Sequence, residues 1–168
     1  MSARIPEVTP GRMLSGECLC GDVRYRVEDR FRYALNCHCS QCRKATGSAF
    51  KPFAGIERDK LSITHGQDGL TVFGDEHAQD VHCRRCGSLL YSVVRDGQYV
   101  HVTLGTLVDE PSIRPSAHIF VGSKAPWYSI TDSCRNMRSS ADDTDHYPLF
   151  DVRRRGRRCD AVLRLLVR

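Results

Sequence analysis

The chain has 168 residues, enough for one ordinary domain, and its 40% hydrophobic content is too high for a mostly disordered protein. It carries 25 Lys and Arg against 20 Asp and Glu, and no apolar run approaches the roughly 20 residues of a membrane span. The basic excess lies in the last stretch: residues 151–168 hold seven Arg and two Asp, so residues 1–150 are charge-balanced. The first 16 residues contain no apolar stretch of the secretory type, so we expect a reducing, cytoplasmic compartment.

Most segments predict short strands. Val23, Tyr25 and Val27 alternate with arginines, the pattern of a strand with one buried face. We expect further strands at 61–64, 70–73, 89–94, 99–104 and 117–121. Arg95–Gln98, with Asp-Gly at its centre, predicts a hairpin turn between two of them. A single short helix is expected from about Ser40 to Ala45, with Ser40 as its cap. The fold class is therefore mainly β, with zinc knuckles at its loops.

Seven of the nine cysteines fall in three tight groups. These groups are Cys18-Leu19-Cys20, Cys37-His38-Cys39-Ser40-Gln41-Cys42 and Cys83-Arg84-Arg85-Cys86. A disulfide within such a group would close a very small, strained ring, whereas thiolates at this spacing suit Zn²⁺. Cys134 and Cys159 stand apart and are expected to be ordinary free thiols.

The first and third groups have the same local form. Gly21 follows Cys20 and Gly87 follows Cys86, where a knuckle turn favours a residue that tolerates positive φ. Cys18, Cys20, Cys83 and Cys86 are therefore predicted to close one four-sulfur zinc site. A closed site of this kind stabilises the fold and leaves no position for a substrate.

The middle group leaves Cys37, Cys39 and Cys42. Three protein ligands with an open fourth position are typical of a catalytic zinc. The alternative is a second structural site completed by a histidine from elsewhere in the chain. The candidates for that ligand are His82, His101 and His118.

Residues beside the middle group could serve a substrate. Arg43 and Lys44 could bind the carboxylates of a small anionic ligand, or form a solvated surface pair. Gly47 and Ser48 could offer backbone amides and a hydroxyl, although a turn explains Gly47 equally well. His38 could supply a proton or a supporting hydrogen bond, or bond within the knuckle.

Several motifs follow one another in a specific order along the chain. The motifs are Gly16-Glu17-Cys18-Leu19-Cys20-Gly21-Asp22-Val23-Arg24-Tyr25, the middle cysteine group continuing through Arg43-Lys44-Ala45-Thr46-Gly47-Ser48-Ala49-Phe50, Cys83 to Ser88, Gly105-Thr106-Leu107 and Pro126-Trp127. The chain resembles the glutathione-dependent formaldehyde-activating enzymes, a family that includes the centromere protein V domain. The resemblance covers roughly residues 14–130.

The resemblance implies a β-tent-like fold with two zinc ions per chain. It makes the four-cysteine ion structural and the ion on Cys37, Cys39 and Cys42 catalytic. The implied activity is that of a carbon–sulfur lyase working in the direction of addition, joining a thiol such as glutathione to a small aldehyde such as formaldehyde. Its partners would be these small molecules and no membrane; the oligomeric state stays open.

Parts of the chain depart from the family pattern. Position 82 is His where an aromatic residue is expected, and a polar insertion follows Asp132. Trp127 is expected to pack in the core rather than to line a pocket, and Thr106 receives no role. We divide the chain into an N-terminal segment 1–12, a zinc domain 13–132, a polar insertion and domain end 133–150, and a basic tail 151–168. Within the insertion, 133–145 has the composition of a linker.

Two other functions compete with the enzyme. The chain could be a non-catalytic zinc module that binds a macromolecule, with the Arg-rich tail giving weak, salt-sensitive affinity for nucleic acid. The tail lacks interleaved aromatic residues, and a solvated terminal extension explains it as well. The cysteine groups could also sense redox state, a role that zinc-bound thiolates make less favourable.

Overall fold

The computed structural model of the chain describes residues 11–75 and 77–138. Within them the backbone forms one α-helix and a series of short strands, which confirms the predicted mainly β class. In chain order the elements are β1 (Met13–Glu17), β2 (Arg24–Glu28), β3 (Tyr33–Cys37), α1 (Ser40–Thr46), β4 (Lys51–Glu57), β5 (Leu61–His65), β6 (Leu70–Gly74), β7 (Ala78–Cys83), β8 (Leu89–Val94), β9 (Tyr99–Thr103), β10 (Ala117–Ile119) and β11 (Arg135–Asn136). The strands predicted at 61–64, 70–73, 89–94, 99–104 and 117–121 coincide with β5, β6, β8, β9 and β10, although the last two predictions run past the observed ends at Thr103 and Ile119.

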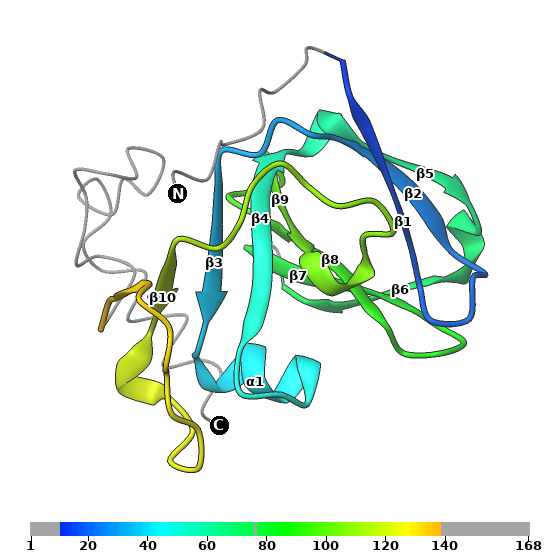
Figure 1. The fold of residues 1–168 in the computed structure, drawn as a ribbon. Helices are drawn as coiled ribbons and strands as arrows, with labels where there is room; N and C mark the ends of the chain where they lie inside the picture. Colours follow the sequence, from blue (N-terminus) through cyan, green and yellow to red (C-terminus); the bar gives the residue numbers. More distant parts are fainter. Residues whose placement is uncertain (1–10, 76, 139–168) are drawn as a thin grey trace.

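The strands form two sheets (Figure 1). A three-stranded sheet has the order β1-β2-β5, and an eight-stranded sheet has the order β11-β10-β3-β4-β9-β8-β7-β6. Every pairing is antiparallel except those of β10, which runs parallel to both β3 and β11. Consecutive strands β5 and β6 belong to different sheets, so the turn between them passes from one sheet to the other.

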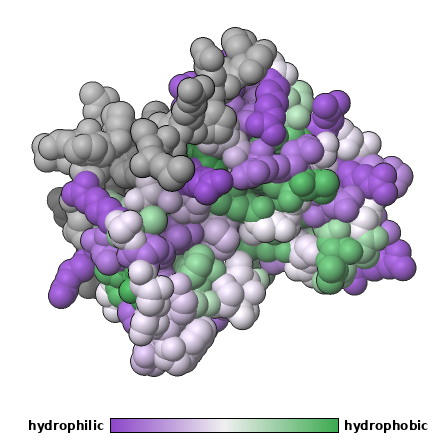
Figure 2. All heavy atoms as spheres, in the orientation of Figure 1, coloured by the Kyte–Doolittle hydropathy of each residue, from purple (hydrophilic) through white to green (hydrophobic). Residues whose placement is uncertain are grey.

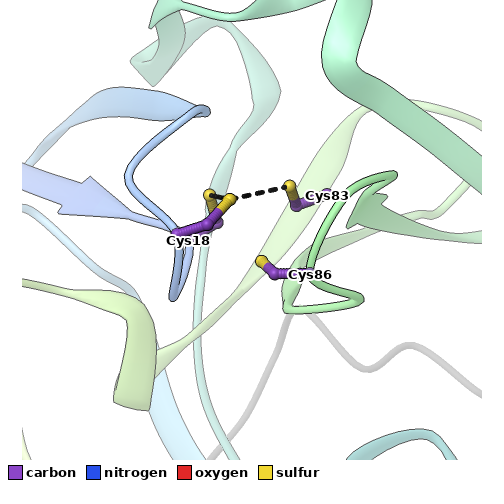
Figure 3. Close-up of side chains that lie close together, drawn as sticks. Cys18, Cys83 and Cys86 are labelled. Carbon is purple, nitrogen blue, oxygen red and sulfur yellow. Dashed lines mark hydrogen bonds between the residues drawn. The ribbon is translucent and has the colours of Figure 1, made fainter.

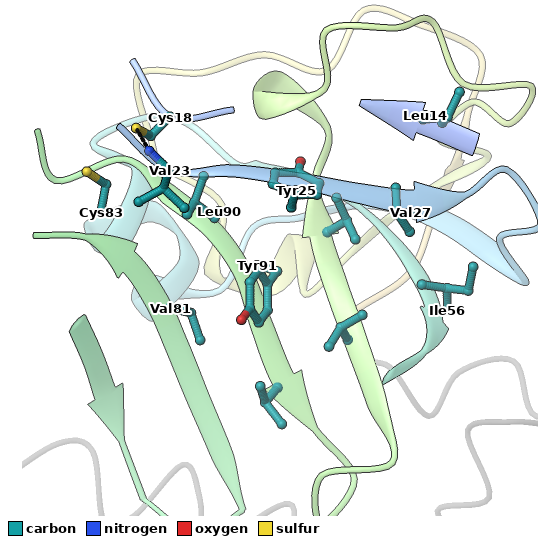
Figure 4. Close-up of a cluster of buried hydrophobic side chains, with 13 residues drawn as sticks. Leu14, Cys18, Val23, Tyr25, Val27, Ile56, Val81, Cys83, Leu90 and Tyr91 are labelled. Carbon is teal, nitrogen blue, oxygen red and sulfur yellow. Dashed lines mark hydrogen bonds between the residues drawn. The ribbon is translucent and has the colours of Figure 1, made fainter. Parts of the chain in front are cut away.

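The main core lies between the two sheets, as Figure 4 shows. In β2, Tyr25 and Val27 are buried and the intervening arginines are exposed, as the alternation in the sequence predicts. These side chains meet Leu90, Val100 and their neighbours from the large sheet. A second, smaller core cluster includes Tyr33, Leu35, Cys37, Phe53, Ala117, Ile119 and Met137.

The helix α1 connects β3 to β4 and carries the end of the middle cysteine group. Its cap is Cys39, not Ser40 as the sequence suggested: the sulfur of Cys39 accepts a hydrogen bond from the amide of Cys42 at 3.3 Å. A cysteine at this position thus satisfies an amide at the helix start and turns its sulfur toward the group. Gly47 ends the helix in the left-handed conformation, with φ of 60°.

The polar stretch after Asp132 is not a linker from its start. Arg135–Asn136 forms β11, and Met137 is buried in the second core cluster. Residues 139–145 of the expected linker, and the basic tail 151–168, lie outside the described residues.

The surface of the molecule mixes hydrophobic and hydrophilic side chains. On the face in Figure 2, hydrophobic side chains show as small areas among hydrophilic ones. Large exposed apolar residues include Phe73 on the edge strand β6, Leu19 and Trp127. In the described part of the chain, no helix has the length and apolar character needed to cross a membrane.

Candidate metal centres

The first and third cysteine groups meet in space. The sulfurs of Cys18, Cys20, Cys83 and Cys86 lie within 4.8 Å of one another. In Figure 3, Cys18 approaches from the loop after β1, Cys83 from the end of β7 and Cys86 from the turn that follows it. The Cys18–Cys20 and Cys20–Cys83 sulfur separations are 3.5 and 3.7 Å. Zinc–sulfur bonds of 2.3 Å in a tetrahedron require separations of about 3.8 Å, so the group fits Zn²⁺ closely.

Both turns have the geometry of metal knuckles. Gly21 and Gly87 adopt φ of 76° and 75°, the left-handed conformation that the sequence predicted for them. An exposed ion pair joins the two turns, because one guanidinium nitrogen of Arg85 donates to both carboxylate oxygens of Asp22 at 2.9 and 2.8 Å. This contact lowers the pKa of Asp22.

The site is also supported by hydrogen bonds from Ser88. Its hydroxyl accepts a hydrogen bond from the amide of Leu19 at 3.0 Å and lies 3.3 Å from the sulfur of Cys86. The hydroxyl and amide of Ser88 lower the pKa of Cys86 to about 5. A thiolate at Cys86 is the form that a metal ion binds.

The middle group also comes together. Cys37 ends β3, Cys39 caps α1 and Cys42 lies in its first turn, and the three sulfurs are within 4.8 Å of one another. Cys37 is buried, whereas Cys39 and Cys42 are half-buried. Among the described residues, no Cys, His, Asp or Glu supplies a fourth ligand atom to this group.

The pKa shifts of the cysteines in the middle group favour a bound cation. Hydrogen bonds from Cys37 and Cys42 lower the pKa of Cys39 to about 2. The contacts of Cys37 with Cys39 and Cys42, together with burial, raise the pKa of the Cys37 thiol far above its usual value. Ionising all three sulfurs together is therefore unfavourable, and a positive charge between them would make it favourable. Zn²⁺, which binds thiolates, meets that requirement.

A buried lysine that the sequence analysis missed lies beside this group. Lys51 pairs with Cys37 across β3 and β4, and its side chain is 4% exposed. Its ammonium donates to the hydroxyl of Ser92 and lies 3.7 Å from Asp80. A lysine at the start of a strand gives no sequence signal for burial; its partners Ser92 and Asp80 come from β8 and β7, far away in the sequence.

A chain of hydrogen bonds runs from His38 to the surface. The Nε2 of His38 lies 2.7 Å from the Nδ1 of His118, and the Nε2 of His118 lies 3.0 Å from a carboxylate oxygen of Asp132. Both histidines are fully buried. Burial, and then the neighbouring His118, lower the pKa of His38. His38 is thereby held in place between two cysteines of the middle group, and Asp132 is a member that the sequence analysis did not assign.

The predicted substrate-binding residues have different surroundings. Arg43 is half-buried, and its Nε is buried without a hydrogen-bond partner among the described residues. Lys44, Gly47 and Ser48 are exposed. The hydroxyl of Ser48 donates to the carbonyl of Phe50, which already satisfies it within the turn. Arg43 is thus the member of this set with a buried donor that no hydrogen bond among the described residues satisfies.

Three other predictions are tested by position. Trp127 is 71% exposed, so the expectation that it packs in the core is wrong; the Pro-Trp segment follows a short helical turn on the surface. His82 contacts the carbonyl of Gly87, and His101 lies 2.8 Å from the hydroxyl of Tyr33. Neither histidine joins the middle cysteine group, so nothing in the described chain completes it as a second structural site.

Comparison with known proteins was made at the level of families, sequences and folds. The family model of the glutathione-dependent formaldehyde-activating enzymes matches residues 13–123. The chain belongs to this family. The match spans β1 to β10 and contains all seven clustered cysteines. The resemblance drawn from the motifs is confirmed.

Two curated relatives match parts of this chain in sequence. A protein of Halomonas elongata is 33% identical over 133 residues, which are 70% of this chain and 81% of the relative. A protein of Talaromyces marneffei is 32% identical over 79 residues, 46% of this chain and 42% of the relative. Both carry the name "putative glutathione-dependent formaldehyde-activating enzyme".

Two further relatives extend the comparison. A protein of Schizosaccharomyces pombe, named as an uncharacterized lyase, is 25% identical over 83 residues, 49% of this chain and 59% of the relative. A crystal structure of a Rhodobacter sphaeroides protein matches with a TM-score of 0.50 and 29% identity, over 58% of this chain and 90% of that one. At family level the comparisons therefore support glutathione-dependent formaldehyde activation and a lyase.

Proposed function

We propose that this member of the family binds a small thiol such as glutathione at the middle cysteine group and adds it to a small aldehyde such as formaldehyde. The observation that carries the proposal is that Cys37, Cys39 and Cys42 hold three sulfurs together with no fourth ligand atom from the described chain. A ligand from solution can therefore complete the group. In the addition, the substrate's S–H bond breaks, a C–S bond forms, the carbonyl π bond breaks, and the proton goes to the carbonyl oxygen.

Zinc bound to these sulfurs would supply a Lewis acid that lowers the pKa of a substrate thiol toward neutral pH, so that a thiolate forms there. The chain's own part is to hold the three sulfurs in place, through the end of β3, the helix cap and the first turn of α1. Three thiolates exceed the charge of a divalent ion by one. Lys51, which pairs with Cys37 across β3 and β4, would bring a positive charge near the group and partly offset this excess.

Arg43 is the proposed binding residue for a carboxylate of the thiol substrate. Its Nε is buried and unpartnered among the described residues, and a carboxylate would satisfy it with a charge-assisted hydrogen bond. Lys44 is exposed on the same helix and would add long-range attraction. His38 is proposed as a positioning residue, because its Nε2 is already engaged by the buried His118.

Calorimetric titration of the full chain tests this proposal, with glutathione as ligand and S-methylglutathione as the thiol-free control. We expect the wild type to bind glutathione at least about tenfold more tightly than the methylated ligand, because only a free thiol can bind metal. Cys39→Ser should lose that preference and one zinc ion per chain. Ser40→Ala, an exposed neighbour, should keep both.

The reaction itself is followed by exchange NMR of glutathione with formaldehyde. The wild type should speed formation of S-hydroxymethylglutathione above the spontaneous rate, and Cys39→Ser should not. Equal affinity for the two ligands, or an unchanged preference in Cys39→Ser, would show that the middle group does not bind the thiol.

A further inference from the structure

Three metal-binding side chains outside the two cysteine groups come together near the end of the described chain. A ring nitrogen of His118, a carboxylate oxygen of Asp132 and the sulfur of Cys134 lie within 4.8 Å of one another. We propose that His118, Asp132 and Cys134 form a third metal site and that Zn²⁺ is the ion it takes. This inference is independent of the proposed enzyme activity.

The pairing of two short strands builds the site. His118 lies on β10, which runs parallel to β11, and His118 is in register with Asn136. The amide of Met137 donates to the carbonyl of His118 at 2.8 Å. This pairing returns the loop before β11 to β10, so Asp132 and Cys134 arrive beside the histidine.

His118 has the environment of a metal ligand. The side chain is fully buried, and its Nδ1 lies 2.7 Å from the Nε2 of His38. Histidines that bind metals through one nitrogen donate a hydrogen bond from the other, which fixes the ring. In the metal-bound form Nδ1–H can donate to His38, and the ion takes the place of the proton that Nε2 shares with Asp132 in the metal-free chain.

The carboxylate is positioned as well. Asp132 lies 3.0 and 3.2 Å from the Nε2 of His118, and one of its oxygens accepts the amide of Cys134 at 2.9 Å. Nitrogen and oxygen ligands at about 2.0 Å from a tetrahedral zinc are about 3.3 Å apart, close to the separations present. The side chain of Asp132 is 48% exposed, so an ion can enter from solvent.

The thiol distinguishes a metal site from a simple histidine–carboxylate pair. A hydrogen bond between Asp132 and His118 would orient the histidine without any help from Cys134. A carboxylate and a thiolate side by side repel each other, and a divalent cation between them converts that repulsion into attraction. The set of one nitrogen, one oxygen and one sulfur is among the ligand types that zinc accepts.

The first measurement is zinc content per chain after dialysis of the purified full chain against micromolar Zn²⁺ in reducing buffer. We expect three ions in the wild type and in Ser133→Ala, which changes the residue between two ligands without removing either. Cys134→Ser and Asp132→Asn should hold two. The same zinc content in all four chains would overturn the proposal, whether that content is two or three.

The second measurement uses the wild-type fold, so it holds even where a variant folds poorly. The rate of Cys134 alkylation by iodoacetamide is followed by peptide mass spectrometry with and without added Zn²⁺. Binding should slow alkylation by roughly tenfold or more in the wild type and Ser133→Ala, and much less in Asp132→Asn. A rate at Cys134 that does not respond to Zn²⁺ in the wild type contradicts the site.

Discussion

At the scale of single residues, backbone conformation decides how closely segments approach the four-cysteine site. Gly66, in the turn between β5 and β6, has φ of 73°, and a Cβ there would lie 1.9 Å from the carbonyl oxygen of Asp22. Asp22 follows the first knuckle and pairs with Arg85 of the second. Because Gly66 has no side chain, the β5–β6 turn can pack directly against the backbone of Asp22, next to the first knuckle.

We predict that Gly66→Ala destabilises the protein much more than Gly97→Ala. Gly97 also has positive φ, 85°, but a Cβ there meets nothing within 4 Å, so its replacement should cost about 1 kcal/mol of unfolding free energy. Gly66→Ala adds a clash with backbone and should cost roughly 3 kcal/mol or more. Urea unfolding at saturating Zn²⁺ measures both. Equal losses would mean that the turn moves away from Asp22 freely.

At the scale of elements, the four cysteines connect turns that belong to different sheets. Cys18 and Cys20 lie between β1 and β2 of the small sheet, whereas Cys83 ends β7 and Cys86 precedes β8 of the large sheet. A metal ion there would join chain segments 63 positions apart. The three-cysteine group instead spans one β3–α1 junction, so its effect on the fold should be local.

Loss of the four-cysteine ion should therefore destabilise the fold far more than loss of the other. Cys83→Ser should lower the unfolding free energy by several kcal/mol, because the ion's binding energy contributes directly to folding. Cys39→Ser should lower it by less while also losing one ion. Thermal unfolding with parallel zinc analysis checks this, and Cys159→Ser, which removes a thiol outside the three sequence groups, is the control. A melting temperature that falls equally in Cys83→Ser and Cys39→Ser would contradict the structural role.

At the scale of the whole molecule, apolar packing holds the two sheets together, and a buried carboxylate joins the small sheet to a loop. Asp29, 1% exposed, binds Arg12 at 2.9 Å and accepts the amide and hydroxyl of Ser112, which joins the small sheet to the segment before β10. Tyr25 crosses the interface between the sheets, and its hydroxyl lies 2.7 Å from that of Thr106. Thr106 thus has a structural role that the sequence left unassigned.

Comparing a valine in the large sheet with a valine in the loop after it measures how much this core contributes to the unfolding free energy. Val100 is fully buried between the sheets, whereas Val108 is 62% exposed. Val100→Ala should cost about 2 kcal/mol of unfolding free energy, and Val108→Ala less than about 0.5 kcal/mol. Urea unfolding again gives the comparison. Similar small losses in both variants would show that the core relaxes around the missing methyl groups.

The predictions from sequence succeed where the signal is local. The alternation in β2 is visible in the sequence because one face of the strand is exposed to solvent. The Asp-Gly turn between β8 and β9 is visible because it needs residues that tolerate positive φ. β3 was missed because all five of its residues are buried, which removes alternation. The exposure of Trp127 and the burial of Lys51 were not predicted, since neither depends on its sequence neighbours.

The sequence by itself determined the chemistry of this protein: three groups of thiols at metal spacing, glycines where the knuckles turn, and a family assignment that follows from their order. These properties depend on residues a few positions apart, whose geometry the backbone alone restricts. Only the tertiary structure decided that His118 is hydrogen-bonded to His38 and lies with Asp132 and Cys134, and that the buried Lys51 pairs with Cys37. Such contacts depend on strand order and register across a sheet, which are set by the packing of the whole core and not by any one segment.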